Sequence, residues 1–195
     1  MNGSDLLNTR SYQELQEKWK EDDGYVLIRE AVPKFYALRF SYWREQLDSP
    51  LLEGTFNQHQ YIWDIRMRPL VYSAFSEVLN NSRLWVDFFN TEPDGVFGLL
   101  AVNKVLGSLR SIENNLSTTF EADVGDLLII DSQRFSVQQL NDSDWLRLRY
   151  IPAQEENLIL TKQREEQFIK DQTKPVFLSS LGRKLLGVES WELHN

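Results

Sequence analysis

The chain has no cysteine, and its 195 residues include only two histidines, His59 and His194. Without cysteine, the chain cannot form a disulfide framework or a thiol nucleophile, and its composition suits a reducing compartment. With only two histidines, far apart in the sequence, a serine nucleophile has no credible imidazole base. The scarcity of these two residue types restricts the possible chemistry more than any residue that is present.

Other absences exclude further classes of function. No stretch approaches the roughly 20 apolar residues of a membrane span, and no apolar run follows a basic start, so we expect no signal peptide. The sequence has no Gly-x-Gly-x-x-Gly or Walker pattern to cradle phosphate. The net charge of −8 argues against nucleic acids and anionic membrane surfaces as partners. We therefore expect a cytoplasmic protein that binds neither nucleic acid nor membranes.

Apolar and aromatic residues, in contrast, are plentiful. Hydrophobic residues make up 42% of the chain and aromatic residues 12%, which is far from a disordered composition. A chain of this length can bury a full hydrophobic core. Because we find no internal repeat, low-complexity tract or Pro/Gly-rich linker, we expect residues 1–195 to form a single domain.

Helix signals occupy the two ends of the chain. A capping-box pattern begins at Ser11, and Pro69 is placed as a first-turn proline. The Gln/Glu/Lys-rich helix near the C-terminus is expected to present a solvated face. The predicted helices lie directly after Ser11 and over residues 33–47, 70–79, 162–171 and 179–186.

Short strands fill the middle of the chain. They are predicted over residues 25–28, 84–89, 96–106, 118–122, 127–130, 135–140 and 145–151. Helices followed by a run of short strands indicate an α+β fold, an antiparallel barrel or jelly roll with helices packed on one sheet. The continuous apolar run Leu127–Ile130 is then expected to be buried on both faces.

Several segments, in order along the chain, resemble the phytanoyl-CoA dioxygenase-type members of the Fe(II)/2-oxoglutarate-dependent dioxygenase superfamily. The resemblance implies a double-stranded β-helix (a cupin-like jelly roll) with N-terminal and C-terminal helices packed on the major sheet. The segments are DGYVLIR (23–29), RMRP (66–69) with LWV (84–86), GLLAVN (98–103), GDLLIIDSQRFSVQQLNDSDWLRLRYIP (125–152) and LSSLGRKLLG (178–187) followed by Trp191.

The sequence departs from this family at the residues that would bind iron. Active members hold iron(II) with His-x-Asp and a distal histidine, but this chain has Glu92-Pro93-Asp94 near the first position and Ser136 at the second. We therefore expect no metal site and no cofactor. Glu92 and Asp94 are interpreted either as part of a solvated turn or as weak Mg²⁺ or Mn²⁺ ligands.

Arg147 stands roughly where the resemblance implies a 2-oxoglutarate-binding arginine. Strand alternation puts it on the same side as Arg149, with Leu146, Leu148 and Tyr150 on the other side. If the apolar side packs on helices, Arg147 points into the barrel, where it could bind a carboxylate. The alternative is a structural ion pair with a nearby acidic residue.

The first functional hypothesis is a pseudoenzyme, a catalytically inactive dioxygenase-like protein. The resemblance implies a partner role, either in a heterodimer with an iron-bearing dioxygenase paralogue or with a second copy of this chain. The partner's substrate would be a terpenoid or lipid-like secondary metabolite, by family analogy. Candidate contacts are the aromatic-rich helix at residues 35–43 or the apolar residues Leu185 and Leu186.

The second hypothesis is a metal-independent isomerase, cyclase or lyase that uses the remnant barrel pocket. Its general acid or base would be a carboxyl group such as Glu92, Asp94 or Asp131, with a tyrosine or Arg147 as the electrophile. The sequence leaves open whether the chain is an enzyme, although we do not expect an active dioxygenase from this chain by itself.

Overall fold

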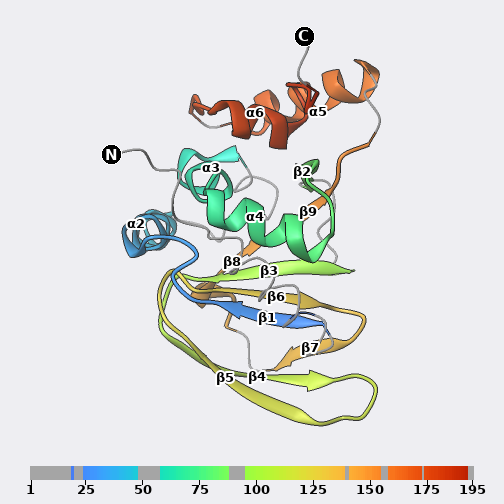
Figure 1. Cartoon of the computed structure of the whole chain (residues 1–195). Coiled ribbons are helices and arrows are strands. Elements are labelled where there is room, and N and C mark those ends of the chain that lie inside the picture. Colours follow the sequence, from blue (N-terminus) through green and yellow to red (C-terminus); the bar gives the residue numbers. More distant parts are fainter. Residues whose placement is uncertain are drawn as a thin grey trace, which may run out of the picture.

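The computed structural model describes residue 19 and residues 24–47, 58–87, 95–138, 141–154, 158–172 and 174–192. This part of the chain contains five α-helices and three antiparallel sheets, which confirms the α+β class. Figure 1 shows the helices on one side of a four-stranded sheet and a three-stranded sheet on the other side. The helix predicted after Ser11 lies outside the described residues, apart from Trp19.

The helices are α2 (Lys34–Glu45), α3 (Gln60–Arg66), α4 (Pro69–Val78), α5 (Leu158–Lys170) and α6 (Ser180–Leu186). The four-stranded sheet has the order β1 (Tyr25–Ile28), β6 (Leu127–Asp131), β3 (Val96–Ala101) and β8 (Trp145–Leu148). The three-stranded sheet has the order β5 (Ser117–Ala122), β4 (Val105–Ser111) and β7 (Phe135–Gln138). A third sheet pairs β2 (Leu84–Val86) with β9 (Tyr150–Pro152). Within the described residues, no helix combines the length and the apolar character needed to cross a membrane.

Local signals explain where several helices begin and end. Pro69 opens α4, as predicted, because its missing N–H would have no partner within the first turn. The Ser179 hydroxyl caps α6 by accepting a hydrogen bond from the N–H of Gly182. Helix α6 ends at Gly187, whose φ of 85° is the left-handed conformation that favours glycine.

Several features differ from the sequence predictions. The strand predicted over residues 145–151 is two strands, β8 and β9, which belong to different sheets. Helix α3 was not predicted, because it has only seven residues and follows a polar stretch typical of a loop. The strand predicted over residues 96–106 is two strands, β3 and β4, which belong to different sheets. The bend at residues 102–104 carries the chain from the four-stranded sheet to the three-stranded sheet.

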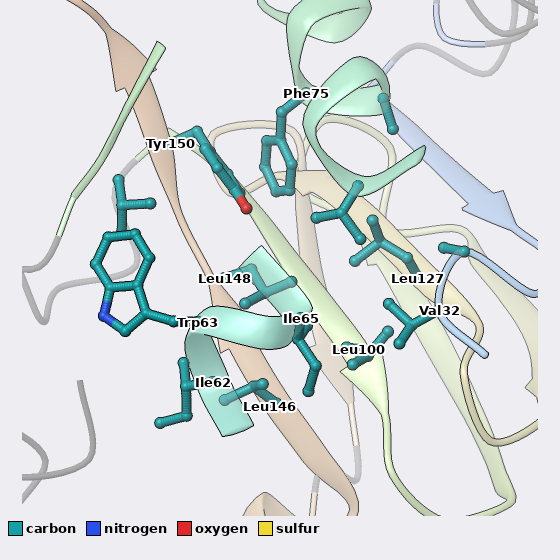
Figure 2. Packing of buried hydrophobic residues seen from close by; sticks show 14 of the residues in the cluster. Val32, Ile62, Trp63, Ile65, Phe75, Leu100, Leu127, Leu146, Leu148 and Tyr150 are labelled. Carbon is teal, nitrogen blue, oxygen red and sulfur yellow. The ribbon is translucent and has the colours of Figure 1, made fainter. Parts of the chain in front are cut away.

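One face of the four-stranded sheet packs against the helices, and we call this interior the helix-side core. Figure 2 shows Leu127, Leu146 and Leu148 of the sheet facing Ile62 and Ile65 of α3. Phe75 of α4 approaches the sheet closely where β3 has Gly98, because a Cβ there would lie 2.8 Å from the Phe75 ring. The helices therefore lie directly on the strands.

The other face of the same sheet packs against the three-stranded sheet, and we call this interior the inter-sheet core. Leu128 and Ile130 of β6 belong to it, whereas Leu127 and Ile129 belong to the helix-side core. All four side chains are 0% exposed, so the prediction that Leu127–Ile130 is buried on both faces is confirmed.

Candidate functional site

The resemblance directs attention to the space between the two sheets, because members of the family that the chain resembles hold their site inside the barrel. Apolar side chains from both sheets fill that space. Trp145 carries a buried indole N–H for which the described residues offer no acceptor. The buried members of this inter-sheet core are Phe97, Leu99, Ala101, Val105, Leu109, Ala122, Leu128, Ile130 and Trp145. Tyr25, Leu27, Phe120, Phe135 and Val137 pack against them.

Strand β7 directs its polar residues away from this interior. Phe135 and Val137 pack on the inter-sheet core, so alternation puts Ser136 and Gln138 on the outer face of the sheet. The Ser136 hydroxyl lies 3.4 Å from the carbonyl oxygen of Arg110, and it accepts a 2.9 Å hydrogen bond from Gln138 Nε2. Phe135 and Val137, rather than Ser136, are therefore the inward positions of β7.

Arg147 lies on β8 and alternates with residues of the helix-side core. The structure confirms that Leu146, Leu148 and Tyr150 face the helices, so Arg147 is on the opposite face of the strand. Its side chain is exposed, and its guanidinium lies 5.7 Å from the centre of the Phe97 ring. The fold does not bring Arg147 and Ser136 into one site, because Ser136 faces outward from the other sheet.

Arg149, between β8 and β9, forms a structural ion pair of the kind that the sequence analysis considered for Arg147. Its Nε lies 3.2 Å from an Asp87 carboxylate oxygen, and both side chains are largely buried. The pair joins the end of β2 to the segment that follows β8. The role of Arg149 is therefore structural.

The carboxyl candidates lie elsewhere. Asp131 ends β6 and shapes the turn into β7, where its Oδ1 accepts a 2.9 Å hydrogen bond from the N–H of Gln133. Glu92, Asp94 and His194 lie outside the described residues. The structure thus assembles no acid–base pair from the sequence candidates that it describes.

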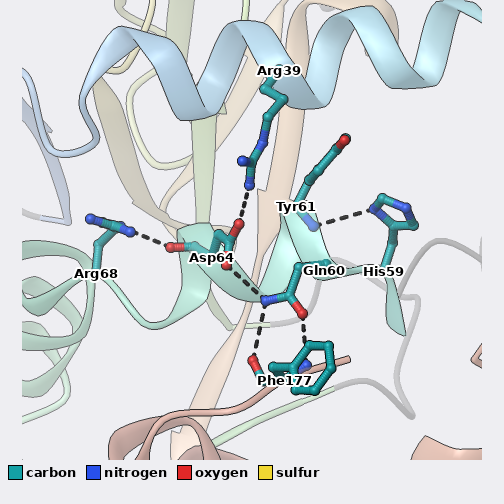
Figure 3. Close-up of polar contacts among 7 residues, drawn as sticks. All are labelled: Arg39, His59, Gln60, Tyr61, Asp64, Arg68 and Phe177. Carbon is teal, nitrogen blue, oxygen red and sulfur yellow. Dashed lines mark hydrogen bonds and ion pairs between the residues drawn. The ribbon is translucent and has the colours of Figure 1, made fainter. Parts of the chain in front are cut away.

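His59 begins helix α3 instead of pointing at a site between the sheets. Its Nδ1 accepts a 3.2 Å hydrogen bond from the N–H of Tyr61, as Figure 3 shows, and its ring stacks on Trp43 at 3.8 Å. Burial lowers the pKa of His59 below 6.5, and the Lys174 and Arg39 cations lower it further, against the opposing effect of Asp64. The neutral imidazole therefore serves as a helix cap.

A polar network beside His59 ties three segments together (Figure 3). Asp64 of α3 pairs with Arg39 of α2 and accepts a 2.8 Å hydrogen bond from Gln60 Nε2. Gln60 also bonds the backbone of Phe177 in both directions, at 2.7 and 3.1 Å. Because every partner is within the chain, we interpret the network as structural.

Two buried guanidinium groups on the helix side escaped the sequence reasoning. Arg164 of α5, which is 2% exposed, donates hydrogen bonds to the carbonyl oxygens of Leu186 at 2.6 Å and Val86 at 2.7 Å. The predicted solvated face of this helix is confirmed, since Lys162, Glu165 and Glu166 are exposed, and Arg164 lies on its buried side. Arg66 of α3 is 3% exposed, and burial lowers the pKa of each arginine to about 10, so both stay charged at neutral pH.

The side chains between the sheets do not fit an iron(II) ion. Iron(II) sites of this type need imidazole nitrogen and carboxylate oxygen ligands, whereas the inter-sheet core consists of hydrocarbon and aromatic groups. Within the described ranges, no three histidine, aspartate or glutamate side chains gather closely enough to hold a metal.

Comparison with known proteins adds no assignment at the level of sequence. The chain matches no protein-family model, and no curated protein matches it significantly.

Proposed function

We propose that this chain is a non-catalytic, dioxygenase-like protein that acts by binding an iron-bearing relative. The observation that carries the proposal is the apolar filling of the space between the sheets. A site that activates oxygen needs metal ligands and room for a keto acid, and a packed hydrocarbon core supplies neither. What such a protein retains is its fold and its surface.

The strand order supports a double-stranded β-helix, the finer fold that this proposal assumes. From β3 to β8 the chain moves repeatedly between the two sheets, with β3, β6 and β8 in one and β4, β5 and β7 in the other. Jelly rolls are wound in this way. The helices that cover one face of the larger sheet agree with the arrangement that the resemblance implies.

The inward residues of β7 support the loss of the distal iron ligand. Phe135 packs its ring edge-on against Tyr25 at 5.0 Å, and Val137 is paired with the buried Leu109 of β4. Neither side chain has an atom that binds iron(II). The partner would therefore supply the metal and 2-oxoglutarate, and act on a terpenoid or lipid-like metabolite in the cytoplasm, by family analogy.

Anaerobic titration of the isolated chain with iron(II), followed by 2-oxoglutarate, tests the loss of the site. We expect no stoichiometric iron binding, and equally weak 2-oxoglutarate binding by wild type and Arg147→Gln, because Arg147 is exposed. Stoichiometric iron at near-micromolar affinity would overturn the proposal.

Co-expression with iron-bearing dioxygenase-like proteins encoded nearby tests the partner role. We expect a 1:1 complex by size-exclusion chromatography with light scattering, and faster turnover by the iron-bearing subunit than in its absence. No complex with any of them, and unchanged turnover, would count against the role. Conversion of a substrate by the isolated chain after exhaustive chelation would instead favour the metal-independent isomerase, cyclase or lyase.

A further inference from the structure

Helix α2 carries apolar side chains on its outward face as well as its inward face. Phe35, Leu38 and Tyr42 are 63%, 50% and 66% exposed. Their spacing of three and four residues puts them in one stripe along the helix. The buried residues of α2, Ala37 and Phe40 among them, lie on the other side, so the chain's own core does not account for the stripe.

An exposed charged residue lies at each end of the stripe, and the two residues have opposite charges. Lys34 is the first residue of α2, and Glu45, whose carboxylate lies 3.4 Å from the Ser41 hydroxyl, is the last. The helix dipole favours the reverse arrangement, with anions at the N-terminus and cations at the C-terminus. Neither residue forms an ion pair within the described part of the chain, so no ion pair among these residues explains their placement.

We propose that α2 pairs with α2 of a second copy of this chain, in antiparallel orientation about a twofold axis. A twofold interface uses the same surface of both copies and must therefore be self-complementary. Along α2 the stripe runs from a cation through an aromatic ring, a leucine and a second aromatic ring to an anion. When one helix is reversed, each cation therefore lies opposite an anion and each aromatic ring opposite an aromatic ring. Phe35 then faces Tyr42 of the second copy, Leu38 lies beside the axis, and Lys34 meets Glu45 of the second copy. A parallel pair would bring like charges together.

The body of the protein holds α2 in place for such an interaction. Figure 3 shows Arg39 pointing from α2 to Asp64 of α3, and the Arg39 guanidinium lies 4.1 Å from the centre of the Tyr61 ring. Arg44 of α2 donates hydrogen bonds to the carbonyl oxygens of Asp142 at 3.2 Å and Trp145 at 3.1 Å. Because the helix is fixed from its inner side, little further ordering is needed to present the outer stripe.

The stripe contributes three apolar side chains per copy, which is a small interface. We therefore expect a weak, concentration-dependent dimer and not an obligate one. The inference does not rest on the proposed function, because it concerns a surface of the chain and not the space between the sheets.

Reciprocal charge variants test the pairing by analytical ultracentrifugation over a wide range of concentration. Lys34→Glu and Glu45→Lys should each weaken self-association about tenfold or more, since each puts like charges opposite one another at both ends of the interface. Mixed together, the two variants should form a 1:1 dimer, because every cross-interface pair is then of opposite sign. Both substitutions favour the helix dipole, so circular dichroism should show an intact fold.

Leu38→Asp provides a second, independent variant, because two carboxylates would meet beside the axis. It should abolish dimerisation, whereas the control Leu106→Asp, at a 75% exposed position on β4, should leave it unchanged. A wild-type chain that stays monomeric at every concentration overturns the inference. So does a mixture of the two charge variants that remains monomeric, or an α2 face that binds only an iron-bearing relative. The iron titration and turnover assays report separately on the proposed function.

Discussion

The two faces of strand β6 border interiors of different chemical character. On the helix side, Leu127 and Ile129 share their core with the phenol of Tyr150, whose hydroxyl donates a 2.8 Å hydrogen bond to the Arg66 carbonyl. The charged groups of Arg66 and Arg164 are buried in the same layer. On the other side, Leu128 and Ile130 border an inter-sheet core that is almost wholly apolar.

These buried polar groups therefore lie on the helix side of the four-stranded sheet. They do not lie in the space between the sheets, where the resemblance implies the reaction site. Tyr150 and Arg164 of the helix layer bind the chain itself, Arg164 by joining α5 to α6 and β2. The space between the sheets, which the resemblance marks as the reaction site, is packed as a second core. Tyr150 and Arg164 therefore fasten α3 and α5 to the sheet that β2 and β9 form.

The largest effects on stability are expected when neighbouring leucines on opposite faces of β6 are truncated. Leu127→Ala and Leu128→Ala should each lower the free energy of unfolding by about 2–5 kcal/mol, because both side chains are fully buried. Urea denaturation followed by tryptophan fluorescence measures both losses. A Leu128→Ala variant as stable as wild type would mean that the inter-sheet space is a hydrated pocket and not a core.

Removing one buried cation tests the polar character of the helix side. Arg164→Met keeps most of the apolar stem but leaves the Leu186 and Val86 carbonyl groups without their donor, which should cost about 2–4 kcal/mol. Arg83→Met is the matched control, because its ion pair with Glu192 is exposed and should contribute less than about 1 kcal/mol. Equal losses in urea unfolding experiments would refute a special role for Arg164.

The smallest expected effect is a pH dependence that arises on the helix side. Because the pKa of His59 is lowered in the folded state, its contribution to stability is complete above the unfolded pKa of about 6.5. As the pH falls below that value, the unfolded chain binds a proton more readily than the folded chain, and stability decreases.

His59→Asn keeps a helix-capping side chain and removes this titration. The variant should lose less stability than wild type between neutral and mildly acidic pH, as measured by urea denaturation across that range. Parallel pH profiles for the two proteins would show that His59 does not cause the loss.

Alternation and helix-end signals predicted much of the fold. The apolar run Leu127–Ile130 and the alternation of Leu146, Arg147 and Leu148 predicted which faces are buried, because backbone geometry alone sets the direction of strand side chains. Pro69 likewise predicted the start of α4. These are local effects, so a local pattern is sufficient to find them.

Other features depend on long-range contacts that no local pattern contains. Arg164 is buried because carbonyl groups far away in the sequence meet it. The apolar residues Leu185 and Leu186, considered as partner contacts, are 0% and 1% exposed within the chain's own core, so that prediction was wrong.

The segment from β8 to β9 limits how this gene can change by insertion or deletion. Residues 145–152 serve two sheets in succession, with β8 paired to β3 and β9 paired to β2. Gaining or losing one codon before Leu146 would reverse the faces of the strand and turn Arg147 and Arg149 towards the helices. Length variation among descendants of this chain should therefore accumulate outside this stretch.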